Sequence, residues 1–178
     1  HNGADDNASG TAGLLEIAEK FAGVKKQLDR KVVFIAFSGE ELGLLGSSFV
    51  VNNFPLPIEN NIAMINMDMI GRLNEKNDLI IYGTGTSSKW KNILDDKNEY
   101  DFNLTFNDEG FGPSDHSSFY GKKVPVLFFF TGTHSDYHKP SDDADKINAE
   151  GQEKLLKFVY DVALNIVNSE TRPDYISV

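Results

Sequence analysis

The feature that most constrains the fold is an apolar run that ends in two adjacent glutamates. Residues 32–37 are all apolar, which is typical of a strand buried on both faces of a sheet. Ser38 and Gly39 interrupt the run, and Glu40 and Glu41 follow at once. The sequence therefore predicts a central strand with two carboxylates directly after its end.

The glutamate pair lies at a predicted turn between this strand and a helix. Leu42, Leu44 and Leu45 begin a helical pattern over residues 42–53. Neighbouring side chains at such a turn point in different directions, so one can bind a metal and the other can act on that metal's water. Acidic residues also favour the positive end of a helix dipole without any chemistry. The other carboxylates of the chain must decide between these interpretations.

Strands alternate with helices along the rest of the chain. Further strands are predicted at residues 62–67, 79–82, 104–106 and 125–130, and helices at 10–21, 87–94, 117–120 and 149–168. This alternation predicts an α/β fold, namely a three-layer α/β/α sandwich with a mainly parallel central sheet.

Composition excludes several classes of function. The chain of 178 residues suits a single globular domain, and no apolar run approaches the ~20 residues of a membrane span. A formal net charge of −10 argues against binding to nucleic acid or anionic lipid. Because the chain has no cysteine, a transition-metal site must use His, Asp and Glu.

Such residues follow the predicted buried strands. Glu40 and Glu41 follow the first, Asp68 follows the strand at 62–67, and His138 lies in the loop after the strand at 125–130. Sites in open α/β sheets form at the carboxyl ends of strands. Carboxylates gathered there repel one another, and a divalent cation removes that cost. The sequence thus predicts a hydrolytic metal site, although spacing alone does not choose the reaction.

The order of the motifs supports a specific resemblance. The motifs are Gly-Ala-Asp-Asp-Asn-Ala-Ser-Gly at 3–10, Ser-Gly-Glu-Glu-Leu-Gly at 38–43, Asn-Met-Asp-Met at 66–69, Ser-Asp-His-Ser at 114–117 and Tyr-His at 137–138. Across its whole length the chain resembles metallopeptidase family twenty-eight, the co-catalytic di-zinc aminopeptidases of the bacterial leucyl type.

The resemblance implies a role for each matching residue. Asp6 would bridge two zinc ions, Glu41 and His138 would complete one zinc site, and Asp68 would serve the other. Glu40 would be the general base. Asp5 is an alternative bridging residue, because chemistry does not separate adjacent aspartates, although the motif register favours Asp6.

Three further positions match the part of the family that meets substrate. Tyr137 is similar to the tyrosine that donates a hydrogen bond to the tetrahedral oxyanion in some relatives. Met69 and Phe111 fall where the family lines an apolar pocket for the first side chain of the substrate.

The resemblance also implies that residues 1–178 are the C-terminal portion of a single zinc-peptidase domain. Upstream strands and one histidine ligand of the second zinc would lie outside the chain. One zinc site, formed by Asp6, Glu41 and His138, would then be complete, whereas the second would be short of a ligand.

The implied activity is removal of N-terminal residues, apolar ones above all, from peptides with a free N-terminus. The missing N-terminal part of the domain is a further expected partner, and the implied location is periplasmic or extracellular. Two alternatives remain at this point. One is a single-zinc acyltransferase similar to glutaminyl cyclases, and the other is a non-catalytic binding domain with a peptidase-like fold.

Other polar residues near the motifs receive structural interpretations. His116 is expected in a pocket wall or supporting a ligand, and His134 on the surface. Asp142 either orients His138 or is solvated. Arg72 is expected in a structural ion pair, and Asp115 is expected to fix its loop.

Overall fold

The computed structural model describes residues 2–55 and 57–178. Its sheet has four strands in the order β1-β4-β2-β3. β1 (Met64–Met67) is parallel to β4 (Val126–Phe130), and β2 (Asp78–Tyr82) is parallel to β3 (Asn103–Asn107), whereas β2 and β4 are antiparallel. The prediction of a mainly parallel sheet is confirmed.

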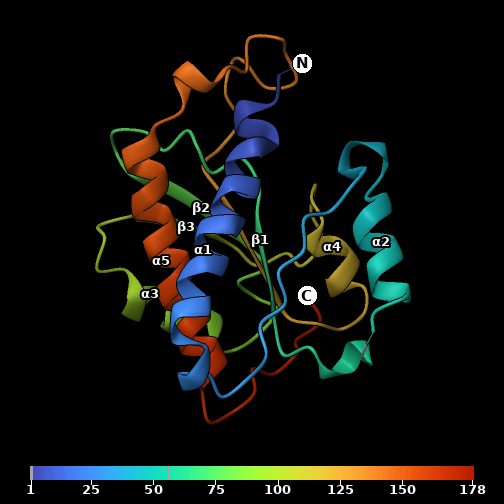
Figure 1. The fold of residues 1–178 in the computed structure, drawn as a ribbon. Coiled ribbons are helices and arrows are strands. Elements are labelled where there is room, and N and C mark those ends of the chain that lie inside the picture. Colours follow the sequence, from blue (N-terminus) through green and yellow to red (C-terminus); the bar gives the residue numbers. More distant parts are fainter. Residues whose placement is uncertain (1, 56) are drawn as a thin grey trace.

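Helices cover both faces of this sheet, as Figure 1 shows. α1 (Gly10–Val24) and α5 (Ala149–Asn168) lie on one face, with α3 (Trp90–Lys97) against α5. α2 (Leu45–Asn52) and α4 (His116–Tyr120) lie on the other face. The predicted three-layer architecture is confirmed.

The long last helix shows how the sequence forms these layers. The Asn148 side chain accepts the N–H of Gly151 at 2.9 Å and so caps the first turn. The apolar stripe of this helix is buried in the core beside the sheet and comprises Leu155, Phe158, Val159, Val162 and Ile166. Burial of this stripe anchors α5 to the larger of the two apolar cores.

The second core is smaller and lies on the opposite face. It contains Val51 of α2, Phe119 and Tyr120 of α4, and Val124 and Val126 at β4. β4 therefore has apolar side chains covered on both faces, as expected for a strand inside a three-layer fold.

Short helical turns connect these elements. They are a π-type turn at Ala4–Ser9 and 3₁₀ turns at Lys25–Gln27, Glu40–Leu42, Ile58–Asn60 and Ala144–Lys146. None of the helices within the described residues is both long and apolar enough to cross a bilayer.

The prediction of a buried strand at residues 32–37 is wrong. These residues have no regular secondary structure, and Val33 is 57% exposed. Their main chain makes no hydrogen bond to another described residue, and a strand exists only as one side of a hydrogen-bonded ladder. The apolar pattern is present, but the described chain supplies no neighbouring strand for it.

Candidate metal centre

Three side chains from distant parts of the sequence meet at one end of the sheet. Ligand atoms of Asp6, Glu41 and His138 all lie within 4.8 Å of one another. His138 Nε2 is 3.2 Å from Asp6 Oδ2 and 3.2 Å from Glu41 Oε1. The structure therefore brings together the three residues that were predicted to form the complete zinc site.

Asn7 fixes the segment that carries Asp6. Its side-chain amide donates to the carbonyl of Met67 at 3.0 Å, and its Oδ1 accepts the N–H of Gly10 at 2.9 Å and that of Met69 at 3.2 Å. The motif is thereby tied to the end of β1 and to the start of α1. Asp6 is held where β1 ends.

The two adjacent aspartates have different surroundings. Asp5 is fully buried, and its Oδ1 accepts the Gly71 N–H at 2.7 Å and the Ser9 hydroxyl at 3.0 Å. Its Oδ2 lies 3.1 Å from His134 Nε2. Because both oxygens of Asp5 have partners within the scaffold, the geometry favours Asp6 as the ligand.

The side chain of Asp142 holds the main chain of Asp5 and Asp6. Its buried Oδ2 accepts the main-chain N–H groups of Asp5 and Asp6 at 2.9 and 3.0 Å, and its Oδ1 accepts from Arg72 at 3.2 Å. Arg72 also pairs with Asp136, so its predicted structural ion pair is confirmed. The interpretation of Asp142 as a solvated residue is wrong.

The glutamate pair lies in the 3₁₀ turn Glu40–Leu42, between two glycines in the left-handed region. Gly39 has φ 69° and Gly43 has φ 97°, a conformation that costs glycine little. This tight turn directs Glu41 to His138. Its neighbour Glu40 lies close enough to Asp68 and Asp115 for their negative charges to raise its pKa.

Asp68 follows β1 directly, as predicted. Its Oδ2 accepts the hydroxyl of Ser114 at 2.8 Å, and Ser114 in turn accepts the Asn66 amide at 2.7 Å. Its other oxygen, Oδ1, is buried and has no hydrogen-bond partner among the described residues. A buried carboxylate oxygen without a partner is costly unless a cation or donor reaches it.

Burial and mutual repulsion raise the pKa values of the carboxylates in the centre. Burial, reinforced by Asp68 and Glu41, raises the pKa of Glu40 to about 7. Burial together with nearby carboxylates raises the pKa of Asp6 to about 6, although His138 partly offsets this. The pKa of Asp68 also rises to about 6 through burial, despite the hydrogen bond from Ser114. A divalent cation among these groups would reverse the repulsion.

Tyr137 is fixed against the predicted ligand histidine. The rings of Tyr137 and His138 stack with centroids 3.8 Å apart and an interplanar angle of 26°. Burial and the charges of the surrounding carboxylates, including Asp6 and Glu41, raise the pKa of the Tyr137 phenol. Tyr137 is therefore a protonated hydrogen-bond donor beside the centre at neutral pH.

The donor set fits zinc. One imidazole and two carboxylates match the ligands that zinc uses in the absence of thiolates. The unpartnered Oδ1 of Asp68 adds a further anionic oxygen beside them. Asp6, Glu41 and His138 would hold one ion, and Asp68 faces the same region.

The two residues predicted to line a substrate pocket lie in different environments. Met69 is buried, whereas Phe111 is 60% exposed and packs edge-on against Tyr120 with ring centroids 4.7 Å apart. Their role in substrate binding stays a prediction.

His116 and His134 lie outside the cluster of Asp6, Glu41 and His138. His116 is fully buried, stacks on Phe128, and has no partner for either ring nitrogen among the described residues. The surface interpretation of His134 is wrong, because its side chain is only 14% exposed and contacts Asp5. Nothing in the local sequence indicates that contact, since the two residues are 129 positions apart.

Fold and centre together define an α/β protein with a carboxylate-rich candidate metal site at one end of its sheet. The chain belongs to Peptidase family M28, which it matches over residues 1–163. It is 30% identical to the aminopeptidase YwaD of Bacillus subtilis over 98% of this chain and 40% of that protein. It is 34% identical to leucine aminopeptidase 2 of Trichophyton rubrum over 73% of this chain and 28% of that protein.

Solved structures agree with this assignment. BSAP, a zinc aminopeptidase from Bacillus subtilis, superposes with a TM-score of 0.80 at 29% identity, covering 98% of this chain and 45% of that one. The LapA aminopeptidase of Legionella pneumophila gives a TM-score of 0.82 at 26% identity, covering 95% and 48%. The chain thus spans less than half the length of these relatives.

Proposed function

We propose that this chain carries the catalytic centre of a zinc-dependent aminopeptidase, which hydrolyses the first peptide bond of a substrate with a free N-terminus. The observation that carries the proposal is the convergence of Asp6, Glu41 and His138 within 4.8 Å. Membership of Peptidase family M28 and the likeness to proteins named aminopeptidases support the choice of reaction.

Zinc held by Asp6, Glu41 and His138 would polarise the scissile carbonyl and lower the pKa of water toward ~7. Asp68, with its unpartnered Oδ1, and Asp6 would hold a second ion. Among the described residues, the first site would have three protein ligands and the second would have two.

Glu40 acts as the general base and then as the general acid. It follows the turn at Gly39 and is close enough to Asp68 and Asp6 for their charges to raise its pKa, and it is not one of the three grouped ligands. It takes a proton from the attacking water and returns that proton to the leaving amine. Tyr137, stacked on His138, donates a hydrogen bond to the oxyanion.

The acidic centre selects a substrate with a cationic terminus. Burial raises the pKa values of Asp6, Glu40 and Asp68, and the charge of neighbouring carboxylates raises each of them further, as expected where acidic groups gather. A free N-terminal ammonium is attracted to such a site, whereas a blocked terminus is not. We propose that Met69 and Phe111 favour an apolar first residue.

The adjacent glutamates provide a matched pair of variants. Glu41→Gln removes a ligand, so zinc affinity measured by calorimetric titration should fall, by about tenfold or more. Glu40→Gln should leave zinc affinity near that of the parent while hydrolysis of leucyl-p-nitroanilide by the full-length enzyme falls at least about a hundredfold. Equal zinc affinity for parent and Glu41→Gln would contradict the centre, and undiminished turnover by Glu40→Gln would contradict the base.

The same assays separate the alternative functions. A glutaminyl cyclase-like enzyme would cyclise a peptide with N-terminal glutamine and leave leucyl-p-nitroanilide intact. A binding domain would turn over neither substrate even when loaded with zinc.

A further inference from the structure

Residues 172–178, which follow α5, form a segment without regular secondary structure. Near the start of α3, Asp174 accepts the hydroxyl of Ser88 at 2.9 Å and the main-chain N–H of the same residue at 3.1 Å. Ile176 donates its N–H to the carbonyl of Thr86 at 2.8 Å. Hydrogen bonds to other parts of the chain therefore fix the course of this 172–178 segment.

The segment leads to Tyr120, the last residue of α4. The hydroxyl of Tyr120 accepts the N–H of Val178 and donates to the carbonyl of the same residue, both at 2.9 Å. Figure 1 shows the C-terminus beside α4. The ring of Tyr175 lies near that of Tyr120, with centroids 5.6 Å apart. Tyr120 therefore links the 172–178 segment to α4.

The ring of Tyr120 also supports the loop that carries Phe111. The two rings pack edge-on, with centroids 4.7 Å apart and an interplanar angle of 87°. A Cβ at Gly110 would lie closer than 3.0 Å to the Tyr120 ring, so the main chain of this loop rests directly on the ring. Phe111 is 60% exposed and open to a ligand, whereas Tyr120 is only 3% exposed and supports it from within the fold.

The next part of the loop is held by contacts that do not involve Tyr120. Gly112 donates its N–H to the Ser117 hydroxyl at 2.8 Å, and its carbonyl accepts from that hydroxyl at 2.6 Å. Two residues further on, Ser114 donates to Asp68 at 2.8 Å. The loop is therefore tied to the metal centre independently of its support by Tyr120.

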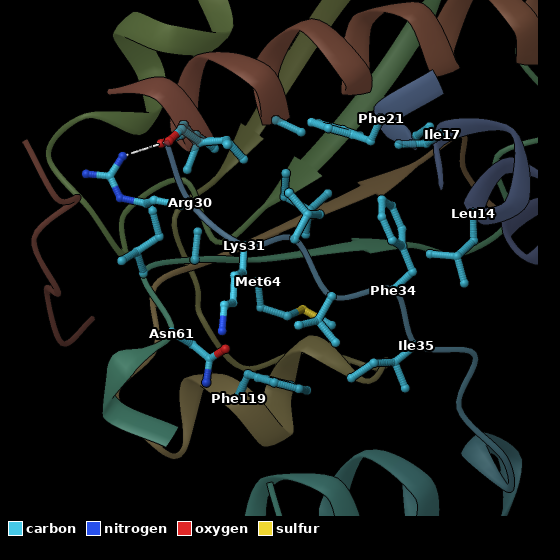
Figure 2. Close-up of a pocket in the computed structure, with 18 of the residues that line it drawn as sticks. Leu14, Ile17, Phe21, Arg30, Lys31, Phe34, Ile35, Asn61, Met64 and Phe119 are labelled. Carbon is cyan, nitrogen blue, oxygen red and sulfur yellow. Dashed lines mark hydrogen bonds between the residues drawn. The ribbon is translucent and has the colours of Figure 1, made fainter. Parts of the chain in front are cut away.

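α4 is likewise anchored without the Tyr120 hydroxyl. Phe119 is buried and belongs to the smaller apolar core together with Val124. Figure 2 shows Phe119 beside the apolar pocket that Met64 of β1 also lines. Removal of the Tyr120 hydroxyl should therefore release the 172–178 segment without displacing α4.

We propose that Tyr120 is a positioning residue, through which the 172–178 segment holds Phe111 and so sets the preference for the first side chain of the substrate. This inference rests on the proposed aminopeptidase function, in which Phe111 contacts that side chain. One methylene group in a well-shaped apolar pocket is worth about 10- to 200-fold in kcat/KM. A pocket wall that moves adapts to side chains of different size, so loosening of Phe111 reduces this discrimination.

The preference is measured as the ratio of kcat/KM for leucyl- over alanyl-p-nitroanilide with the full-length enzyme. Phe111→Ala removes the ring itself and should lower the ratio by about tenfold. Tyr120→Phe keeps the supporting ring but frees the 172–178 segment. It should lower the ratio by about threefold or more, through a higher KM for the leucyl substrate at similar kcat. Tyr100→Phe, which removes a hydroxyl that donates to Asp161 at 2.5 Å, is the matched control and should keep the parent ratio.

Asp174→Ala tests the segment itself, because it removes the hydrogen bonds from Ser88 and leaves Tyr120 unchanged. It should lower the ratio as Tyr120→Phe does, whereas Glu170→Ala, at an exposed acidic residue ahead of the segment, should not. Zinc affinity should equal that of the parent in all these variants. A merely structural role of Tyr120 would lower kcat for both substrates equally and keep the parent ratio, which would overturn the proposal.

A readout that needs no activity separates this inference from the proposed function. Phe111→Trp places an indole against the Tyr120 ring, and acrylamide quenching of its fluorescence reports its packing, since the native Trp90 is fully buried. Adding Tyr120→Phe should raise the quenching constant by about twofold or more. Equal quenching with and without the hydroxyl would overturn the proposal.

Failure of the parent to hydrolyse either substrate would overturn the proposed function and, with it, the role of Tyr120 in substrate preference. The quenching comparison would still show whether Tyr120 holds the Phe111 loop. Activity with an unchanged ratio in Tyr120→Phe, beside a lowered ratio in Phe111→Ala, would overturn this inference alone.

Discussion

The carboxylate of Asp142 accepts the main-chain N–H of Asp6 at 3.0 Å, across 136 positions of sequence. The same oxygen accepts the N–H of Asp5, and Arg72 pairs with the other oxygen. Burial disfavours the charge of Asp142, yet these donors hold its pKa below the ordinary value. Asp142 is therefore an anion that fixes the main chain beneath the candidate ligand.

Replacing Asp142 should weaken the centre without touching a predicted ligand. In Asp142→Asn, charge-assisted hydrogen bonds to Asp5, Asp6 and Arg72 are lost or weakened. Zinc affinity should fall by about tenfold or more, and the free energy of unfolding by about 2 kcal/mol. Calorimetric titration and urea unfolding measure the two effects. Asp143→Asn, beside it in the same loop, is the control, and equal behaviour of the two variants would refute this role.

Two glycines of α1 should respond in opposite ways to alanine. A Cβ at Gly10 would lie closer than 3.0 Å to the Met67 carbonyl and to Asn7 Oδ1, so the Asp6 segment must shift. Gly10→Ala should lower both stability and zinc affinity. A Cβ at Gly23 meets nothing within 4 Å, so Gly23→Ala should raise the free energy of unfolding by about 0.5–1 kcal/mol through helix propensity. Urea unfolding of both variants tests this contrast, and stabilisation by Gly10→Ala would contradict it.

The buried hydroxyl of Thr86 should contribute strongly to the free energy of unfolding. Its Oγ1 accepts from Trp90 Nε1 at 3.0 Å and from the Val126 N–H at 3.0 Å, and it contacts the Gly83 carbonyl at 2.7 Å. Thr86→Val keeps the shape but leaves two buried donors unpaired, at a cost of about 2–4 kcal/mol. Thr86→Ser keeps the hydroxyl and should lose less. Equal losses in urea unfolding would show that packing dominates.

His116 should make the protein less stable as pH falls. Burial lowers its pKa from 6.5 to about 4 in the folded state. Between these values the unfolded chain takes up a proton that the folded chain does not, so stability falls as pH decreases, by roughly 3 kcal/mol over the full range.

The variant His116→Phe isolates this contribution, because it keeps an aromatic ring against Phe128. Lowering the pH from about 7.5 to about 5 should cost the parent about 2 kcal/mol more than the variant. Urea unfolding at the two pH values provides the comparison. Identical pH dependence in both proteins would mean that His116 takes up its proton equally in the folded and unfolded states, which would contradict the lowered pKa.

Apolar segments that pack into the sheet or against it were predicted correctly from the sequence. The apolar run that has no partner strand was not. Residues 125–130 were predicted as a buried strand and residues 149–168 as a helix, and β4 and α5 match them closely. Residues 32–37 have the same apolar character but no ladder. Periodicity reports which side chains favour burial, whereas strand formation also depends on a second main chain.

The sequence predicted that the candidate ligands lie at the same end of the sheet. It did not distinguish Asp5 from Asp6 by their contacts, and it did not reveal the partner of His134. Asp5 and Asp6 are chemically equivalent until Gly71 and Ser9 are seen to occupy the oxygens of Asp5. His134 was misplaced for the same reason, because its partner lies far away in sequence. Such contacts depend on tertiary packing, which local patterns do not encode.

The long-range tie between Asp142 and Asp6 has a consequence for synthesis. Protein chains emerge from the ribosome N-terminus first, and domains fold as units once their parts are available. The segment around Asp6 leaves the ribosome early, yet the side-chain carboxylate that accepts the Asp6 main-chain N–H is translated 136 residues later. The nascent chain therefore cannot complete the loop of the candidate metal centre until Asp142 has been translated.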